Sequence, residues 1–207
     1  MIEYSLLEGI LTPQLTFPSD IRPLKFFLPS KGIFKRKKNR WVETHLVNNA
    51  NTVERSAKDM LDRKCVEKYI SFLCSSLDIV PPRVHYGAEE MQSETTIAQA
   101  TRGGDIYLRD IGEQDERDVL FAIAHEIRHI WQIREHESEF FENYKPTRSC
   151  HNVNEYNLQK AELDANAYAT AVMVTHFNCH PMFKGLDKMV KDEIYRRASG
   201  IALSEEV

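Results

Sequence analysis

Hydrophobic residues recur at three- and four-residue steps in several parts of this 207-residue chain. Such spacing places apolar side chains along one face of a helix. The pattern predicts helices over residues 52–77 and 115–136, the second with acidic residues in its first turn, where the helix dipole favours them. Two more helices are expected over residues 154–177, rich in alanine, and over residues 182–199.

Three short segments between the first two helices are predicted to be β-strands. Residues 83–87, 95–100 and 105–109 are short runs containing β-branched and aromatic residues. The pair Gly103 and Gly104 predicts a tight turn between the last two strands. A small sheet combined with several helices indicates the α+β fold class.

The first fifty residues differ from the rest of the chain. Repeated prolines exclude a long helix there and disfavour a central strand. The sequence therefore divides into an N-terminal extension over residues 1–50, whose role the pattern does not assign, and a main domain over residues 51–207. The prolines that define the extension are Pro13, Pro18, Pro23 and Pro29.

A run of basic residues lies within this extension, and it has two interpretations. It could contact nucleic acid or an acidic partner, or it could be a solvated turn between short strands. The solvated turn is favoured, because one short run neutralises few phosphates and the whole chain has a formal net charge of −4. The run consists of Lys31, Lys35, Arg36, Lys37, Lys38 and Arg40.

The composition is that of an ordinary globular protein, with 42% hydrophobic and 28% charged residues. No apolar run approaches the length of a membrane span, and the first residues lack the layout of a secretory signal. The four cysteines show no C-x-x-C spacing, so reduced thiols are expected. These features together predict a cytoplasmic protein that does not act at a membrane, and they argue against nucleic acid as a partner. A protein or peptide substrate is expected as the partner from the metal-site motif, not from composition.

The motif with the clearest chemistry is an H-E-x-x-H pattern within the helix predicted over residues 115–136. His125 and His129 are one turn apart, so both imidazoles can face one metal ion. Glu126 lies beside them and can take a proton from a water that the metal activates. The alternative is two ordinary histidines on a helix face, and the helical context favours the metal site.

A catalytic zinc ion normally has three protein ligands and one open position. The extended pattern H-E-x-x-H-x-x-G-x-x-H would need a glycine at Gln132 and a histidine at Glu135, so that class is excluded. Several other side chains remain candidates for the third ligand, namely His151, His176, His180 and Cys150.

Glu162 is the better candidate for the third ligand. It lies on the alanine-rich helix, which can pack beside the motif helix, and Asn166 follows it by one turn on the same face. Asn166 could hydrogen-bond the far nitrogen of a ligand histidine. Asp164 projects about 200° away from Glu162, so both cannot face one ion. Spacing alone does not distinguish this metal-binding role from the alternative, in which Glu162 is an ordinary solvent-exposed acid on the helix.

An H-E-x-x-H motif followed by a helix with E-x-x-x-N-x-x-A, here Glu162, Asn166 and Ala169, resembles the gluzincin metallopeptidases. Within that group the chain is most similar to minimal-core members and to ImmA/IrrE-type peptidases of phages and mobile elements. The resemblance covers about residues 52–178. One departure is Arg128, where such enzymes often have a small residue.

The resemblance implies a zincin-like fold, in which a small, twisted, mainly antiparallel sheet packs on two active-site helices. It also implies that His125, His129 and Glu162 bind Zn²⁺, that Glu126 is the general base, and that Asn166 supports a ligand. No tyrosine or histidine stands at a fixed offset to stabilise the transition state, and Tyr144 and His151 are the candidates.

The expected function is therefore zinc-dependent hydrolysis of peptide bonds, with residues 104–108 offering a strand to an extended substrate. One alternative is a catalytically inactive zinc-binding protein with a structural or regulatory role, such as a phage or mobile-element component. Another is a metalloprotein that acts at nucleic acid through the basic run. The sequence does not name a substrate, and it does not define an oligomeric state.

Overall fold

The computed structural model describes residues 15–16, 61–87, 91, 96–109 and 114–203. Over these residues the chain is mostly helical, with short strands, and belongs to the α+β class. Its elements in chain order are β1 (Leu15–Thr16), α1 (Arg63–Ser76), β2 (Val84–Tyr86), β3 (Ala98–Ala100), β4 (Ile106–Leu108), α2 (Glu116–Phe141), η2 (Thr147–Ser149), α3 (Val153–Asn157), α4 (Lys160–Phe177), β5 (Met182–Phe183) and α5 (Lys188–Ala198).

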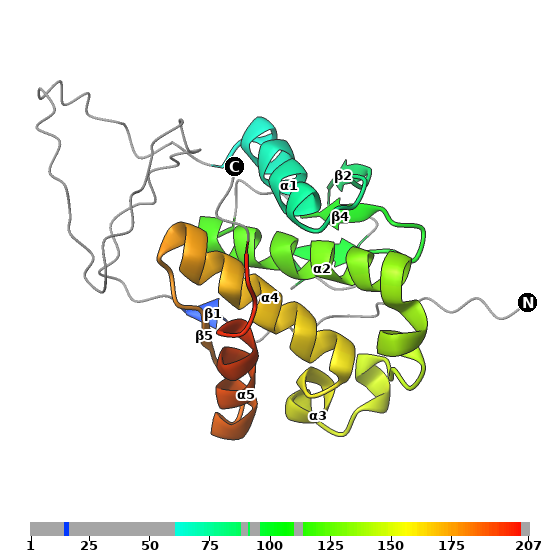
Figure 1. Ribbon diagram of the computed structural model, residues 1–207, viewed down its shortest axis with the longest axis vertical. Helices are drawn as coiled ribbons and strands as arrows, with labels where there is room; N and C mark the ends of the chain where they lie inside the picture. Colours follow the sequence, from blue (N-terminus) through cyan, green and yellow to red (C-terminus); the bar gives the residue numbers. More distant parts are fainter. Residues whose placement is uncertain (1–14, 17–60, 88–90, 92–95, 110–113, 204–207) are drawn as a thin grey trace, which may run out of the picture.

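Helices α2 and α4 form the centre of the fold and pack directly against each other (Figure 1). Helix α1 and strand β3 contact α2, while α5 packs on α4. The alanines expected to let another helix approach are all buried, namely Ala161, Ala165, Ala167, Ala169 and Ala171. Three of them, Ala161, Ala165 and Ala169, lie four residues apart and are fully buried. Their four-residue spacing aligns them in one row along α4, which permits close helix packing.

The three-stranded sheet has the order β2-β4-β3. Strands β3 and β4 are antiparallel and flank a turn in which Gly104 has a φ of +81°. Strand β2 runs parallel to β4. The sheet is therefore mixed, and the expectation of a mainly antiparallel sheet is wrong, because one of its two strand pairings is parallel and the other is antiparallel.

The position of β4 corrects the prediction that residues 104–108 would offer an edge to a peptide. Both sides of β4 are occupied, by β2 and by β3. Hydrophobic periodicity identifies strands but does not order them within a sheet. Strand β3 packs against α2, and among the described strands it has no neighbour on its other side.

All four predicted helices have different boundaries in the structure. The helix expected over residues 52–77 is helical only from Arg63 to Ser76 as α1, after the cap residue Asp62, and residues 52–60 lie outside the described residues. The helix expected over residues 115–136 continues beyond its predicted end as α2, past a non-helical residue, His136, with φ −144° and ψ 31°. The helix expected over residues 154–177 is divided into α3 and α4, which are separated at Leu158 and Gln159.

The last predicted helix, over residues 182–199, begins instead with strand β5. Gly185 has a φ of +80°, which is outside the helical region, so α5 starts only after it. Strand β5 pairs antiparallel with β1. The rest of the proline-rich extension over residues 1–50, including its basic run, lies outside the described residues.

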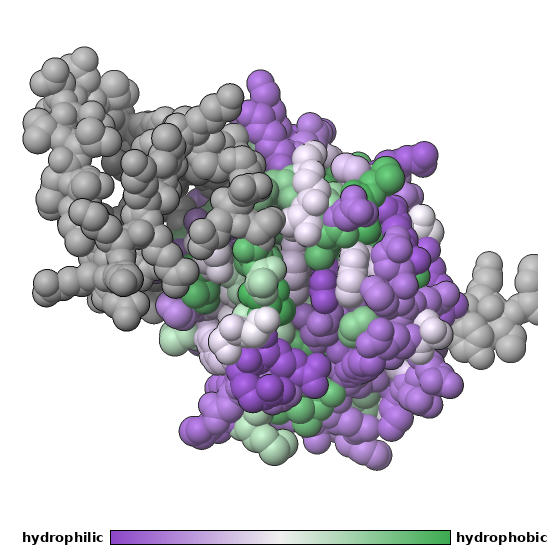
Figure 2. All heavy atoms as spheres, viewed as in Figure 1, coloured by the Kyte–Doolittle hydropathy of each residue, from purple (hydrophilic) through white to green (hydrophobic). Residues whose placement is uncertain are grey.

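Hydrophilic residues predominate on the described surface seen in Figure 2, with small hydrophobic areas between them. Within the described residues, none of the helices combines the length and the apolar character that crossing a bilayer requires. The four cysteines are free, as expected for reduced thiols.

Candidate metal centre

The H-E-x-x-H residues lie on the buried side of α2, facing α4. The side chain of Asp115 caps the start of this helix by accepting a hydrogen bond from the backbone N–H of Arg117. Along the helix, His125 is 5% exposed, and Glu126 and His129 are each 1% exposed. The Nε2 atoms of the two histidines are 2.9 Å apart, so both rings point to one place.

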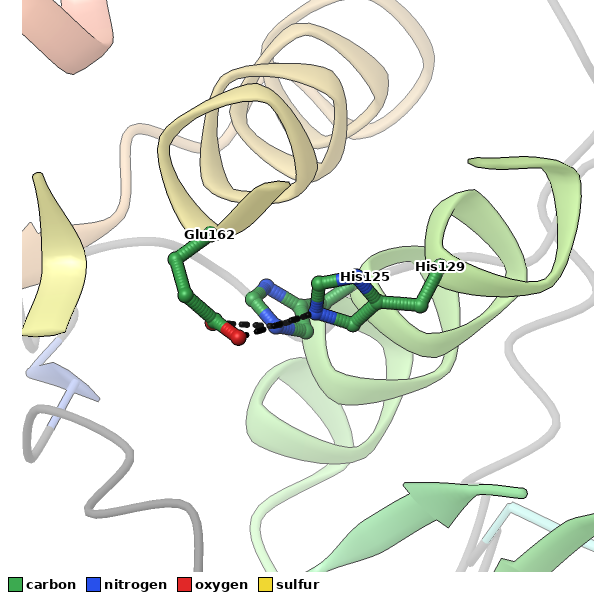
Figure 3. A group of neighbouring side chains, drawn as sticks. All are labelled: His125, His129 and Glu162. Carbon is green, nitrogen blue, oxygen red and sulfur yellow. Dashed lines mark hydrogen bonds and ion pairs between the residues drawn. The ribbon is translucent and has the colours of Figure 1, made fainter. Parts of the chain in front are cut away.

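Glu162 completes a group of three on the facing helix. It lies in the first turn of α4 and is fully buried. Its Oε2 is 3.3 Å from Nε2 of His125, and its Oε1 is 3.4 Å from Nε2 of His129 (Figure 3). The three residues each offer a ligand atom within 4.8 Å of the others, so together they could hold a metal ion.

The surroundings of these atoms fit a divalent cation. The buried Oε2 of Glu162 has no hydrogen-bond partner within the described part of the chain. A buried carboxylate needs a compensating positive charge, which either a protonated imidazole or a bound cation can supply. Two imidazole nitrogens and one carboxylate oxygen leave one position open on a tetrahedral zinc ion. The same donors also suit other divalent transition metals, so they define a class of ion.

The charges within the group stabilise one another. Burial would raise the pKa of Glu162, but His129 and His125 outweigh it and hold that pKa well below its usual range. Burial would likewise lower the pKa of His129, but the Glu162 carboxylate raises it to about 9. In the absence of a cation, the pair therefore carries opposite charges, and a bound metal ion would take the place of the proton on the imidazole.

Two tyrosine hydroxyls meet at Glu162. Tyr144 and Tyr156 each donate to Oε1 of Glu162 at 2.7 Å, and the two hydroxyl oxygens are 2.9 Å apart. Tyr144, a sequence-predicted candidate, therefore lies at the group. Tyr156 was not identified from the sequence, because its position on α3 becomes meaningful only after the break between α3 and α4 is known.

Glu126 is held by the sheet. Its Oε2 accepts a 2.7 Å hydrogen bond from the backbone N–H of Ala100 on β3. Burial raises the pKa of Glu126 above its usual range, although both neighbouring histidines oppose the shift. A carboxylate with a raised pKa, adjacent to a metal group, is suited to accepting and returning a proton.

The other predicted residues lie elsewhere. His151 is exposed, and its backbone N–H donates to Glu155, so it does not join the group. Asn166 is buried and donates to Oδ1 of Asn157. The outer nitrogen of His129, the kind of atom that Asn166 was expected to contact, is bonded by Gln132.

Gln132 and Arg128 are the two residues of α2 whose roles the sequence did not indicate. Gln132 is fully buried and bonds both His129 and residues of α4. Arg128, the departure from the gluzincin pattern, forms a two-bond ion pair with Asp164 on α4 at 2.7 and 3.2 Å. The sequence signal that could have identified Gln132 is its position about one helical turn after His129, where its side chain can reach the imidazole.

Comparison of the chain with protein-family models, with curated proteins and with solved structures finds no significant match. The likeness to gluzincins therefore depends on the motif residues and on the group that they form.

Proposed function

We propose that this protein is a zinc-dependent metallopeptidase. The observation that carries the proposal is the buried group of His125, His129 and Glu162, with the carboxylate of Glu126 next to it on α2. Two imidazoles, one carboxylate and an adjacent acid are the combination that zinc hydrolases use.

A zinc ion bound here would polarise a carbonyl group and acidify a water molecule. Glu126 accepts the proton of the attacking water and passes it to the leaving amine. Its hydrogen bond from Ala100 keeps one oxygen fixed, which leaves the other oxygen for this transfer. Tyr144 is the predicted donor for the developing oxyanion, but its one O–H proton bonds Oε1 of Glu162 at 2.7 Å and would have to turn from that carboxylate to serve this role.

Strand β3 is the proposed docking edge for an extended peptide. The bonds from Thr101 N–H to Asp105 O and from Arg109 N–H to Ile97 O face β4. Because backbone groups alternate along an antiparallel strand, those of Ala98 and Ala100 face the opposite side. Ala100 N–H indeed points to Glu126, so a substrate strand added along this side would place its backbone beside the base.

The proposal is tested by the substitution Glu126→Gln. The amide cannot accept the proton, so hydrolysis of a mixed peptide library should fall by about 10²- to 10⁴-fold. Zinc content, measured by elemental analysis, should be unchanged. The matched control is Glu135→Gln, an exposed acid on the same helix, which should keep wild-type activity. Full activity in Glu126→Gln would remove the assignment.

A second candidate function is a structural or regulatory zinc protein without catalysis. The burial of all three ligands favours it, because structural zinc sites are closed to solvent. In that case the zinc-loaded wild type would cleave no member of the peptide library, while removal of the ion would still destabilise the fold.

A further inference from the structure

A chain of polar contacts runs from the outer nitrogen of His129 to α4. The side-chain oxygen of Gln132, Oε1, is 2.8 Å from Nδ1 of His129. The amide nitrogen of Gln132 donates to the backbone oxygen of Ala161 at 3.0 Å and to Oδ2 of Asp164 at 2.8 Å. The same Oδ2 accepts a 2.7 Å bond from Nε of Arg128.

These contacts determine which way the amide of Gln132 faces. The carbonyl of Ala161 and the carboxylate of Asp164 are acceptors only, so the amide nitrogen must lie toward them. The amide oxygen then faces His129. Gln132 is fully buried, so turning the amide around would leave donors and acceptors unpaired where water cannot replace them.

The orientation of Gln132 in turn determines the proton position on neutral His129. An amide oxygen can only accept, so Nδ1 of His129 must be the donor. Nε2 then carries the lone pair, and it is the atom that lies 2.9 Å from Nε2 of His125 and 3.4 Å from Oε1 of Glu162. This is the tautomer that a metal ion in the group requires.

We propose that Gln132 is a positioning residue that holds His129 as the Nδ1–H tautomer, and that Asp164, anchored by Arg128, holds Gln132. The proposal rests on the metal-binding part of the proposed function and does not need peptide hydrolysis. Arg128 is itself fixed, because its guanidinium lies 3.7 Å from the centre of the Trp131 ring. Arg128, which departs from the gluzincin pattern, thereby acts on His129 through Asp164 and Gln132.

The first test reads the tautomer by long-range ¹H–¹⁵N NMR of histidine-labelled protein. The zinc-loaded wild type should show a protonated Nδ1 and coordination through Nε2 of His129. Metal-free protein is measured at pH 10, where neutral imidazole predominates, and should also show the proton on Nδ1. A proton on Nε2 in the metal-free protein overturns the proposal, whether or not the protein binds zinc.

The second test uses substitutions and zinc competition against a chromophoric chelator. Gln132→Met removes the acceptor at similar size and should weaken zinc binding by about 10- to 100-fold. It should also produce a mixture of tautomers. Gln132→Glu keeps an oxygen toward Nδ1, so the Nδ1–H tautomer should be retained and affinity should fall less than in Gln132→Met.

The matched control is Gln99→Met, the same change at a half-buried glutamine on the side of β3 opposite the buried Ala98 and Ala100. It should leave both the tautomer and the zinc affinity at wild-type values. Equal zinc affinity in Gln132→Met and Gln99→Met overturns the proposal. If Gln132→Met does not fold, the proposal is still tested by the His129 tautomer of the wild type and by the tautomer and zinc affinity of Gln132→Glu. If wild-type protein binds no zinc, the proposed function fails, while the pH 10 measurement still tests the role of Gln132.

Discussion

The two carboxylate oxygens of Glu162 have different surroundings, although they belong to one side chain. Oε1 accepts hydrogen bonds from the hydroxyls of Tyr144 and Tyr156, whereas Oε2 has no such partner among the described residues. Because Oε1 already accepts two hydrogen bonds, Oε2 is the oxygen that is available to a cation. We therefore expect Glu162 to bind an ion through Oε2 alone.

The substitution Tyr156→Phe should weaken zinc binding, because it removes a buried hydroxyl that fixes Oε1. Loss of a support of this kind typically lowers metal affinity by about 10-fold or more. Zinc competition with a chelator measures the change. Tyr69→Phe is the matched control, since Tyr69 is also buried and its hydroxyl donates to Leu120 at 3.2 Å. An equal loss of affinity in both variants would contradict the role given to Tyr156.

At the scale of secondary-structure elements, the start of α2 contains an unsatisfied acid. Asp118 is in the first turn, and its Oδ1 is buried without a hydrogen-bond partner within the described residues. Burial raises the pKa of Asp118 to about 6, with a further contribution from Asp115, while Arg117 opposes the shift. The folded state therefore prefers this carboxyl protonated, and its ionisation costs stability.

The substitution Asp118→Asn should accordingly stabilise the protein in a pH-dependent way. The pKa in the folded state lies above the unfolded value near 3.8, so the penalty is small at pH 4, grows as the pH rises toward the folded pKa, and is complete above about pH 7. We expect a gain of about 1 kcal/mol in the free energy of unfolding at pH 8, after allowance for solvent screening.

Urea unfolding of Asp118→Asn and wild type at pH 4 and pH 8 measures this gain. Glu135→Gln serves as the control, because it removes the charge of an exposed acid on the same helix. Its difference from wild type in the free energy of unfolding should not grow between the two pH values as that of Asp118→Asn does. A difference between Asp118→Asn and wild type that is the same at both pH values would show that burial of the charge is not its cause.

The site divides into a part that was predictable from the sequence and a part that was not. His125 and His129 are related by helix periodicity, which is local, and Glu162 followed from a second motif. The contact of Gln132 with Asp164 depends on how α2 and α4 approach each other, which no local spacing defines. The class of fold was predictable, because helices and strands follow from local hydrophobic spacing. The central position of β4 in the sheet was not, because local spacing does not define how strands are ordered.

At the scale of the whole molecule, the metal group joins the two helices that form the centre of the fold. Of the three residues that could hold an ion, two come from α2 and one from α4, and the Arg128–Asp164 ion pair joins the same helices. An ion bound only by the folded state stabilises it by mass action. Metal binding and global stability should therefore be coupled.

Removal of the ion should lower the melting temperature. Zinc at one hundred times its dissociation constant contributes about 2.7 kcal/mol, which corresponds to a shift of about 5–10 °C for a domain of this size. Differential scanning calorimetry with and without chelator measures the shift. His129→Ala should show no dependence on zinc, while Glu126→Gln should keep it. A wild-type melting temperature that is unaffected by chelator would contradict the coupling.

The short break between α3 and α4 has a consequence for which changes in chain length the site can accept. Tyr156 and Glu162 are six residues apart, and in one continuous helix their side chains would project about 120° from each other around the axis. They meet because Leu158 and Gln159 interrupt the helix. These two residues thus act as a spacer of fixed length, and an insertion or deletion there would rotate the hydroxyl away from the carboxylate while leaving His125, His129 and Glu162 themselves in the sequence.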